Sequence, residues 1–225
     1  LIMTTRTLGL NRRLASLFAG GHYEDRFQTL MLDSIQSGDC VWDIGANVGL
    51  YTKQFAERVG KQGRVFAFEP SPVNLEQIQR TVADQNHVVV LPVALGDRIG
   101  MVGFQQGADA LGATSKVVDT QTSAEQSIIE VEMVRGDELV RAGRAQPPNV
   151  IKIDTEGFEL DVLEGLADLI HHAALRTLCI EVHFGLLEAR GLPDAPARIE
   201  RRLSAAGFRC TWPDASHIVA TRIAG

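Results

Sequence analysis

The sequence predicts an α/β fold in which helices cover both faces of a mostly parallel sheet. Short apolar segments alternate with segments of helical periodicity along most of the 225 residues, a pattern typical of parallel strands joined by crossover helices. One apolar segment, 41–44, runs directly into a glycine-rich turn, and the next, 65–68, ends at an acid. Sheets of this class hold a nucleoside-bearing cofactor in this way, because the turn lets the backbone approach the ligand and the acid can bind the ribose hydroxyls.

The first half of the chain is expected to form three helices and three strands. Gly60 and Gly63 end one helix, Ser71 is a suitable cap for the next, and Pro72 fits its first turn. The expected helices are 24–36, 50–59 and 72–84, and the expected strands are 40–44, 64–68 and 88–91.

The segment 96–134 interrupts this alternation. Two strands are expected in it, in IGMVGFQQ and in IIEVEMVR, and a long stretch of small polar residues joins them. A loop of this length within a compact domain is usually functional. We therefore expect an inserted hairpin, or lid, over the substrate site.

The alternation resumes after the insertion and closes a single domain over 1–225, with 1–22 as an N-terminal arm. The last two strands are expected to pair antiparallel. The expected helices are 136–140, 158–170 and 196–206, and the expected strands are 150–153, 177–182, 208–212 and 217–221.

The composition argues against nucleic-acid and membrane functions. The net charge is −6 and no long basic run is present, so the basic surface of a nucleic-acid-binding protein is not expected. No apolar run approaches the roughly 18 residues that span a bilayer. The three cysteines lie far apart in expected strands, which is typical of buried thiols in a reducing compartment and predicts a cytoplasmic protein.

The glycine turn favours a cofactor without phosphates. Gly45, Asn47 and Gly49 do not reproduce the G-x-G-x-x-G spacing of pyrophosphate-binding turns. Asp43 places a negative charge at the strand end, which suits a cationic or amino group. S-adenosyl-L-methionine carries a sulfonium and an ammonium and no phosphate; Asp43 would help hold its amino acid end, directly or through water, and Glu69 would accept hydrogen bonds from both ribose hydroxyls. The alternative is a glycine turn with packing duties alone.

Five stretches of the chain together resemble the FkbM family of S-adenosylmethionine-dependent methyltransferases. The resemblance runs from about Tyr23 to about Gly185. It implies a Rossmann-like class I methyltransferase fold with strand order 3-2-1-4-5-7-6 and strand seven antiparallel, and O-methylation of small metabolites such as sugars or polyketides. The stretches are VWDIGANVGLYT, VFAFEPSP, VVLPVALGD, VIKIDTEGFELDVLEG and LCIEVHF.

The resemblance also implies which residues line the cofactor pocket. Many methyltransferases carry an acid after strand three that binds the adenine amino group, but here Pro92 to Ala94 take that place. Adenine would therefore meet backbone groups and apolar contacts near Ala94. Glu24 matches a position near the methionine end of the cofactor. The expected cofactor-binding residues are Glu24, Asp43, Gly45, Asn47, Gly49, Glu69, Pro70, Ala94 and Asp154.

A second group of acids points to the transfer chemistry. A hydroxyl nucleophile must lose a proton as it attacks the methyl group, so a base or a metal is expected. Asp154 and Glu156 follow the strand 150–153, and Glu181 and His183 are two apart and share a face if their strand persists. His183 is the first choice for the base and Glu181 the second, with Glu156 beside them and Asp154 ordering cofactor or substrate.

Several alternatives stay open from the sequence. Glu156 could cap the helix that follows it, and Glu181 could pair with Lys152. A divalent metal held by Asp154, Glu181 and His183 is a further alternative. A non-catalytic cofactor-binding sensor, an NAD-type oxidoreductase and an RNA methyltransferase are rival functions. The expected acceptor is a small molecule, and the sequence predicts no oligomeric state.

Overall fold

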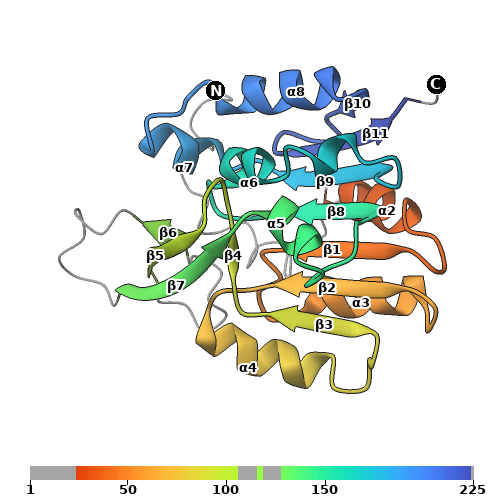
Figure 1. Ribbon diagram of the computed structural model, residues 1–225. Coiled ribbons are helices and arrows are strands. Elements are labelled where there is room, and N and C mark those ends of the chain that lie inside the picture. The colour runs from red at the N-terminus through yellow and green to blue at the C-terminus, as the bar shows by residue number, and fades with distance from the viewer. Residues whose placement is uncertain (1–23, 106–115, 119–127, 224–225) are drawn as a thin grey trace.

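The computed structural model describes residues 24–105, 116–118 and 128–223 and contains a seven-stranded sheet with helices on both faces (Figure 1). All neighbouring strands are parallel except β11, which runs antiparallel to both of its neighbours. The predicted strand order and the antiparallel seventh strand are therefore confirmed. The strands lie in the order β3 (Val88–Leu91), β2 (Arg64–Phe68), β1 (Cys40–Ile44), β8 (Val150–Ile153), β9 (Thr177–Glu181), β11 (His217–Arg222) and β10 (Phe208–Thr211).

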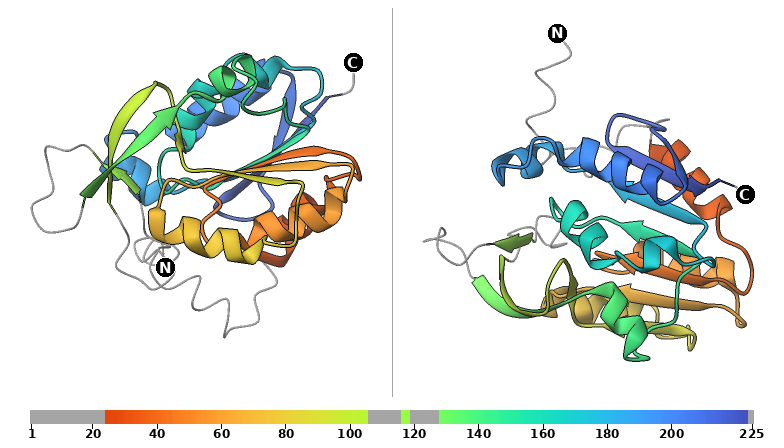
Figure 2. Two further views of the ribbon diagram at one scale, coloured as in Figure 1. Left: turned by 60° about the horizontal axis from the view of Figure 1, so that its bottom comes forward. Right: turned by 45° about the horizontal axis from the view of Figure 1, so that its top comes forward.

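Helices from the two halves of the chain cover opposite faces of this sheet (Figure 2). The faces are separated by the alternation of side chains along β1: Val41 packs with the first-half helices, and Trp42 packs with the second-half helices. The first-half helices are α2 (Glu24–Asp33), α3 (Leu50–Val59) and α4 (Pro72–Thr81). The second-half helices are α5 (Gly136–Arg141), α6 (Glu159–Gly165), α7 (Phe184–Ala189) and α8 (Ala195–Ala205).

The inserted strand segment after β3 is confirmed and forms a second sheet. β5 (Gly100–Gln105) and β7 (Ile128–Val134) pair antiparallel, and β4 (Ala94–Leu95) and β6 (Lys116–Val118) add the two outer strands. Figure 1 places this sheet beside the edge where β1, β2, β8 and β9 end. Residues 106–115 and 119–127, which belong to the predicted lid, lie outside the described residues, so the lid stays a prediction, as does the arm 1–22.

Several predicted elements differ from the structure. The helices expected at 24–36 and 72–84 end three residues earlier, at Asp33 and Thr81. The helix expected at 158–170 is divided into α6 and a short 3-10 helix, Leu169–His171. The strand expected to reach Val182 ends at Glu181, and the unpredicted α7 begins three residues later. The strand therefore does not persist to His183, which instead stands at the start of a helix. No helix in the described part of the chain is long and apolar enough to cross a membrane.

Candidate active site

The turn after β1 adopts left-handed backbone conformations at Gly45, Asn47 and Gly49, with φ of 76°, 53° and 83°. Asparagine is one of the few residues with a side chain that adopt this conformation readily. A Cβ atom at Gly45 would lie 1.9 Å from the carbonyl oxygen of Asp154, and one at Gly49 would lie 2.6 Å from Ile78. The need for glycine at these two positions is therefore already explained by contacts within the protein.

Asp43 lies beneath this turn in a buried ion pair. Its side chain is 0% exposed, accepts a hydrogen bond of 2.6 Å from the Thr52 hydroxyl, and lies 3.1 Å from Nζ of Lys152. Lys152 also donates to the carbonyl oxygen of Gly45 at 3.2 Å and pairs with Asp154 at 3.6 Å. Asp43 therefore has protein partners on both carboxylate oxygens, and these contacts connect it to the turn through Lys152.

Glu69, the residue after β2, accepts a hydrogen bond from the same turn. Its Oε2 accepts from the backbone N–H of Asn47, and its Oε1 accepts from the backbone N–H of Ser71, both at 2.8 Å. The Asn74 amide also donates to Oε1, at 3.4 Å. Burial raises the pKa of Glu69 to about 7, although hydrogen bonds and the charge of Lys152 oppose the rise. A carboxylate has about four acceptor positions, so Glu69 retains capacity for a ligand hydroxyl.

Two buried amide oxygens beside Glu69 lack hydrogen-bond partners among the described residues. They are Oδ1 of Asn47 and Oδ1 of Asn74, and both residues donate to Glu69 through other atoms. A buried polar atom without a partner costs about 1–3 kcal/mol. Hydroxyl or amino hydrogens of a nucleoside would satisfy these oxygens, so this set of acceptors fits the ribose of S-adenosylmethionine.

The other residues expected to bind the cofactor are Pro70, Ala94 and Glu24, and they lie in different environments. Pro70 follows Glu69 and is half-buried. Ala94 is buried at the start of β4, opposite Met133 of β7 in the second sheet. The side chain of Glu24 lies outside the part of the chain that the structure describes. A direct contact of any of these residues with a cofactor stays a prediction.

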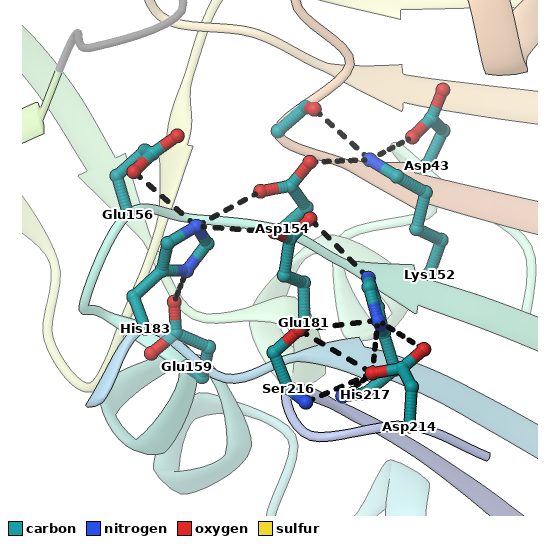
Figure 3. Close-up of polar contacts among 11 residues, drawn as sticks. Asp43, Lys152, Asp154, Glu156, Glu159, Glu181, His183, Asp214, Ser216 and His217 are labelled. Atoms are coloured by element: carbon teal, nitrogen blue, oxygen red, sulfur yellow. Dashed lines mark hydrogen bonds and ion pairs between the residues drawn. The ribbon is translucent and has the colours of Figure 1, made fainter. Parts of the chain in front are cut away.

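Four carboxylates surround the imidazole of His183 at the ends of β8 and β9 (Figure 3). Glu159 meets Nδ1 at 2.8 Å, and Glu156 meets Nε2 at 3.3 Å. Asp154 and Glu181 each lie 3.7 Å from Nε2. The four residues expected to meet beside the methyl donor, Asp154, Glu156, Glu181 and His183, are thus brought together, although His183 arrives from the start of α7 and not from the strand.

This cluster changes the protonation of His183. Burial alone would lower the pKa of the imidazole, and the hydrogen bond and the charge of Glu159 oppose this effect. The charges of Glu156 and Asp154 oppose it too, and together these acids raise the pKa of His183 to about 10. In this arrangement the imidazole carries a positive charge at neutral pH and acts as a hydrogen-bond donor.

Glu159 is a site residue that the sequence reasoning missed. It is the first residue of α6, is 0% exposed, and accepts a hydrogen bond of 2.8 Å from the backbone N–H of Gly157. The acid that accepts a backbone hydrogen bond at the start of α6 is therefore Glu159. The sequence had left this capping role open for Glu156. Glu156 instead has a left-handed φ of 50° and turns its carboxylate toward His183.

Asp214 and His217 were also missed. His217 lies 3.6 Å from Glu181, and Asp214 lies 2.8 Å from the opposite nitrogen of the same imidazole. Burial alone would lower the pKa of His217, but the hydrogen bond and charge of Glu181, followed by those of Asp214, raise it overall. The spacing Asp-x-x-His at the start of the closing strand was the available signal in the sequence.

One set of ligand atoms among the described residues could hold a metal ion. Asp154, Glu156 and His183 each offer one atom, and these atoms lie within 4.8 Å of one another. The set contains Glu156 in the place that the sequence reasoning gave to Glu181. Oxygen and imidazole ligands suit a magnesium or manganese ion.

Comparison with known proteins identifies the domain. The model of the methyltransferase FkbM domain family matches residues 43–210. Hexuronic acid methyltransferase AglP of Haloferax volcanii is 31% identical over 159 residues, which is 70% of this chain and 61% of AglP. The chain therefore spans less than two thirds of the length of this relative.

Solved structures show the same fold. The FkbM methyltransferase of Methylobacillus flagellatus aligns with a TM-score of 0.53 at 19% identity, over 81% of this chain and 43% of that one. SMU.1697c of Streptococcus mutans, solved in complex with S-adenosylhomocysteine, aligns with a TM-score of 0.54 at 9% identity, over 90% of this chain and 99% of that one. At these identities the likeness concerns the fold alone.

Proposed function

The chain belongs to the FkbM methyltransferase family, and from this premise we propose that it transfers a methyl group from S-adenosylmethionine to a hydroxyl oxygen of a sugar or a similar small metabolite. The observation that carries this proposal is the gathering of Glu156, Glu181 and His183 next to the turn after β1. In sheets of this class, ligands bind at the carboxyl ends of the strands. A proton-accepting group would therefore stand beside the methyl donor.

The cofactor would be held by the β1 and β2 side of the site. Glu69 accepts from the ribose hydroxyls, and the amide oxygen of Asn47 supplies a further acceptor. Asp43 supports the cofactor site indirectly. Its charge holds Lys152 against the carbonyl oxygen of Gly45, and this contact fixes the turn. When bound, S-adenosylmethionine supplies a methyl group activated by its positively charged sulfur.

Glu181 is the better placed proton acceptor for the substrate hydroxyl. The side chain of Glu181 is 27% exposed, and that of His183 is 15% exposed. Both nitrogens of His183 already face carboxylates, Glu159 on one side and Glu156 on the other. His183 then serves to hold the carboxylates together, and Glu181 removes the proton as the oxygen attacks.

The acid-rich cluster also constrains the acceptor. Four carboxylates surround one imidazole, and like charges at such distances repel. The end of the acceptor that enters the cluster is therefore an uncharged hydroxyl. If the acceptor is a hexuronic acid, which is the class named for AglP, its own carboxylate points away from His183.

A divalent cation is the alternative means of balancing the same carboxylates. It would take Asp154, Glu156 and His183 as ligands. Manganese binding to the wild-type protein, measured by electron paramagnetic resonance, together with its loss in Asp154→Asn, would favour the cation. Absence of binding at millimolar manganese would leave the charge of His183 in that role.

Calorimetry and a transfer assay test the proposed function. We expect S-adenosylhomocysteine to bind the wild-type protein and to bind Glu69→Ala at least tenfold more weakly, because a buried carboxylate that bonds ribose hydroxyls is lost. Methyl transfer is then measured with p-nitrophenyl glucuronide and p-nitrophenyl glucoside as acceptors. Equal binding by the two proteins would remove the ribose argument, and tight NADH binding without S-adenosylhomocysteine binding would replace the proposal with an oxidoreductase.

A further inference from the structure

We propose that Asp214 and His217 form a positioning pair that holds the Glu181 carboxylate in place for the acceptor hydroxyl. This inference rests on the proposed function, in which Glu181 accepts the proton. Neither residue reaches the cluster around His183 directly; Glu181 lies between them and it (Figure 3). His217 is thus a positioning residue and not a catalytic one.

The sheet itself brings His217 to Glu181. The two residues stand directly opposite each other in the antiparallel pair of β11 and β9. Side chains of such a pair project from the same face at about 5 Å. His217 Nε2 consequently lies 3.6 Å from Oε2 of Glu181.

Asp214 fixes the other side of the imidazole. Both of its carboxylate oxygens lie 2.8 Å from Nδ1 of His217. The same carboxylate accepts hydrogen bonds from the backbone N–H groups of Ser216 at 2.8 Å and His217 at 3.1 Å, so it cannot move without breaking the turn between β10 and β11. Nδ1 therefore donates to Asp214, and Nε2 is directed at Glu181. Against the effect of burial, the two acids raise the pKa of His217, which favours the protonated imidazole, in which both nitrogens are donors.

An aromatic ring from helix α2 holds the plane of this imidazole. The rings of Phe27 and His217 are stacked, with centroids 4.0 Å apart and an angle of 26° between their planes. His217 is only 8% exposed. With its plane and one nitrogen fixed, the imidazole has one orientation in which to meet Glu181.

The carboxylate of Glu181 therefore lies between two imidazoles, those of His183 and His217. Its Oε2 faces His217 at 3.6 Å, and its Oε1 faces His183 at 3.7 Å. A free glutamate side chain samples many rotamers, and ordering it has an entropic cost. A displacement of about 1 Å in a reacting group can lower the reaction rate by about 10²-fold. Holding the Glu181 carboxylate from both sides therefore raises the rate of methyl transfer.

Two substitutions of His217 separate positioning from a purely structural role. His217→Phe retains an aromatic ring that can stack on Phe27 but removes the donors to both Glu181 and Asp214. His217→Gln removes the ring but retains an amide donor. We expect kcat for p-nitrophenyl glucuronide or glucoside to fall about 10–100-fold in His217→Phe and to stay within about fivefold of wild type in His217→Gln, with S-adenosylhomocysteine affinity unchanged in both. The reverse ranking would overturn the inference.

The same substitution in a second background shows whether His217 acts through Glu181. In Glu181→Gln, a further His217→Phe change is expected to have no additional effect on kcat, because coupled residues do not behave additively. An additional fall as large as in the wild-type background would show an independent role and overturn the inference.

Crystal structures of wild type, His217→Phe and His217→Gln provide a measurement that needs no acceptor. Glu181 should keep its position in wild type and His217→Gln and lose it in His217→Phe. An unmoved Glu181 in His217→Phe would overturn the positioning pair. Failure of wild type to bind S-adenosylhomocysteine would instead remove the proposed function, and the crystal structures would still decide how Glu181 is held.

Discussion

Two groups of acids share one edge of the sheet, but the protein buries them to different extents. Asp43 and Glu69, at the ends of β1 and β2, are 0% and 4% exposed. Glu156, beyond the end of β8, and Glu181, the last residue of β9, have side chains that are 21% and 27% exposed. The first pair is held by a lysine, a threonine and backbone N–H groups, and the second pair by imidazoles.

The difference separates acids that shape a pocket from acids that meet a reacting group. A buried carboxylate with fixed donors cannot reorient and is suited to holding a turn. A half-exposed carboxylate beside an imidazole remains accessible to a substrate. We therefore assign the cofactor to the side of Asp43 and Glu69 and the proton transfer to the side of Glu156 and Glu181.

The strongest test of this contrast is the removal of Lys152. In Lys152→Met the carboxylate of Asp43 would remain fully buried without its lysine, and breaking a buried pair in this way costs about 3–5 kcal/mol. We expect a loss of this size in the free energy of unfolding, measured by urea denaturation. The matched control is Arg58→Met, because its pair with Asp33 at 3.5 Å is exposed and should contribute less than about 1 kcal/mol. A similar small loss in both variants would contradict the structural role of Asp43.

The second test removes the charge on the opposite side of the site. Glu181→Gln is expected to lower kcat by about 10²–10⁴-fold, the usual contribution of a general base, while the affinity for S-adenosylhomocysteine stays unchanged. Glu188→Gln is the matched control, since Glu188 is an exposed acid on the neighbouring helix α7. Activity of Glu181→Gln within about threefold of wild type would return the role of base to His183.

The sequence predicts the main sheet well because its strands carry local signals. Each is an apolar run bounded by turn residues, and the family resemblance supplies their order. β4 and β6, of two and three residues, are too short to show periodicity. At the end of α6 a Cβ atom at Gly165 would lie 2.0 Å from the carbonyl oxygen of Gly96, so this glycine is required by a tertiary contact that no local pattern reports.

The candidate site likewise contains contacts that the sequence predicts and contacts that it does not. The meeting of Asp154 with His183 follows from the topology, since both lie beyond neighbouring strand ends. The partnership of His217 with Glu181 depends on the register of an antiparallel pair 36 residues apart in sequence, and no local pattern reports that register. The burial of Asp43 against Lys152 depends likewise on the pairing of β1 with β8.

The smallest expected effect concerns Glu69 and pH. The pKa of Glu69 is raised to about 7 by burial, so its folded-state pKa exceeds the unfolded value of about 4.5. Its contribution to stability is therefore present below about pH 4.5 and is lost as pH rises through 7. Ribose binding should follow the opposite trend, because the ionised carboxylate is the better acceptor for two hydroxyls.

We therefore expect 5′-methylthioadenosine, which has the ribose but no amino acid group titrating near neutrality, to bind about tenfold more tightly at pH 8 than at pH 6. Calorimetry with Glu69→Gln provides the control, because an amide does not titrate and its affinity should stay constant over this range. A flat profile in the wild-type protein would mean that the ribose does not meet Glu69. The contrast between the two sides of the site would then rest on Asp43 and Lys152 alone, with the cofactor bound through other groups.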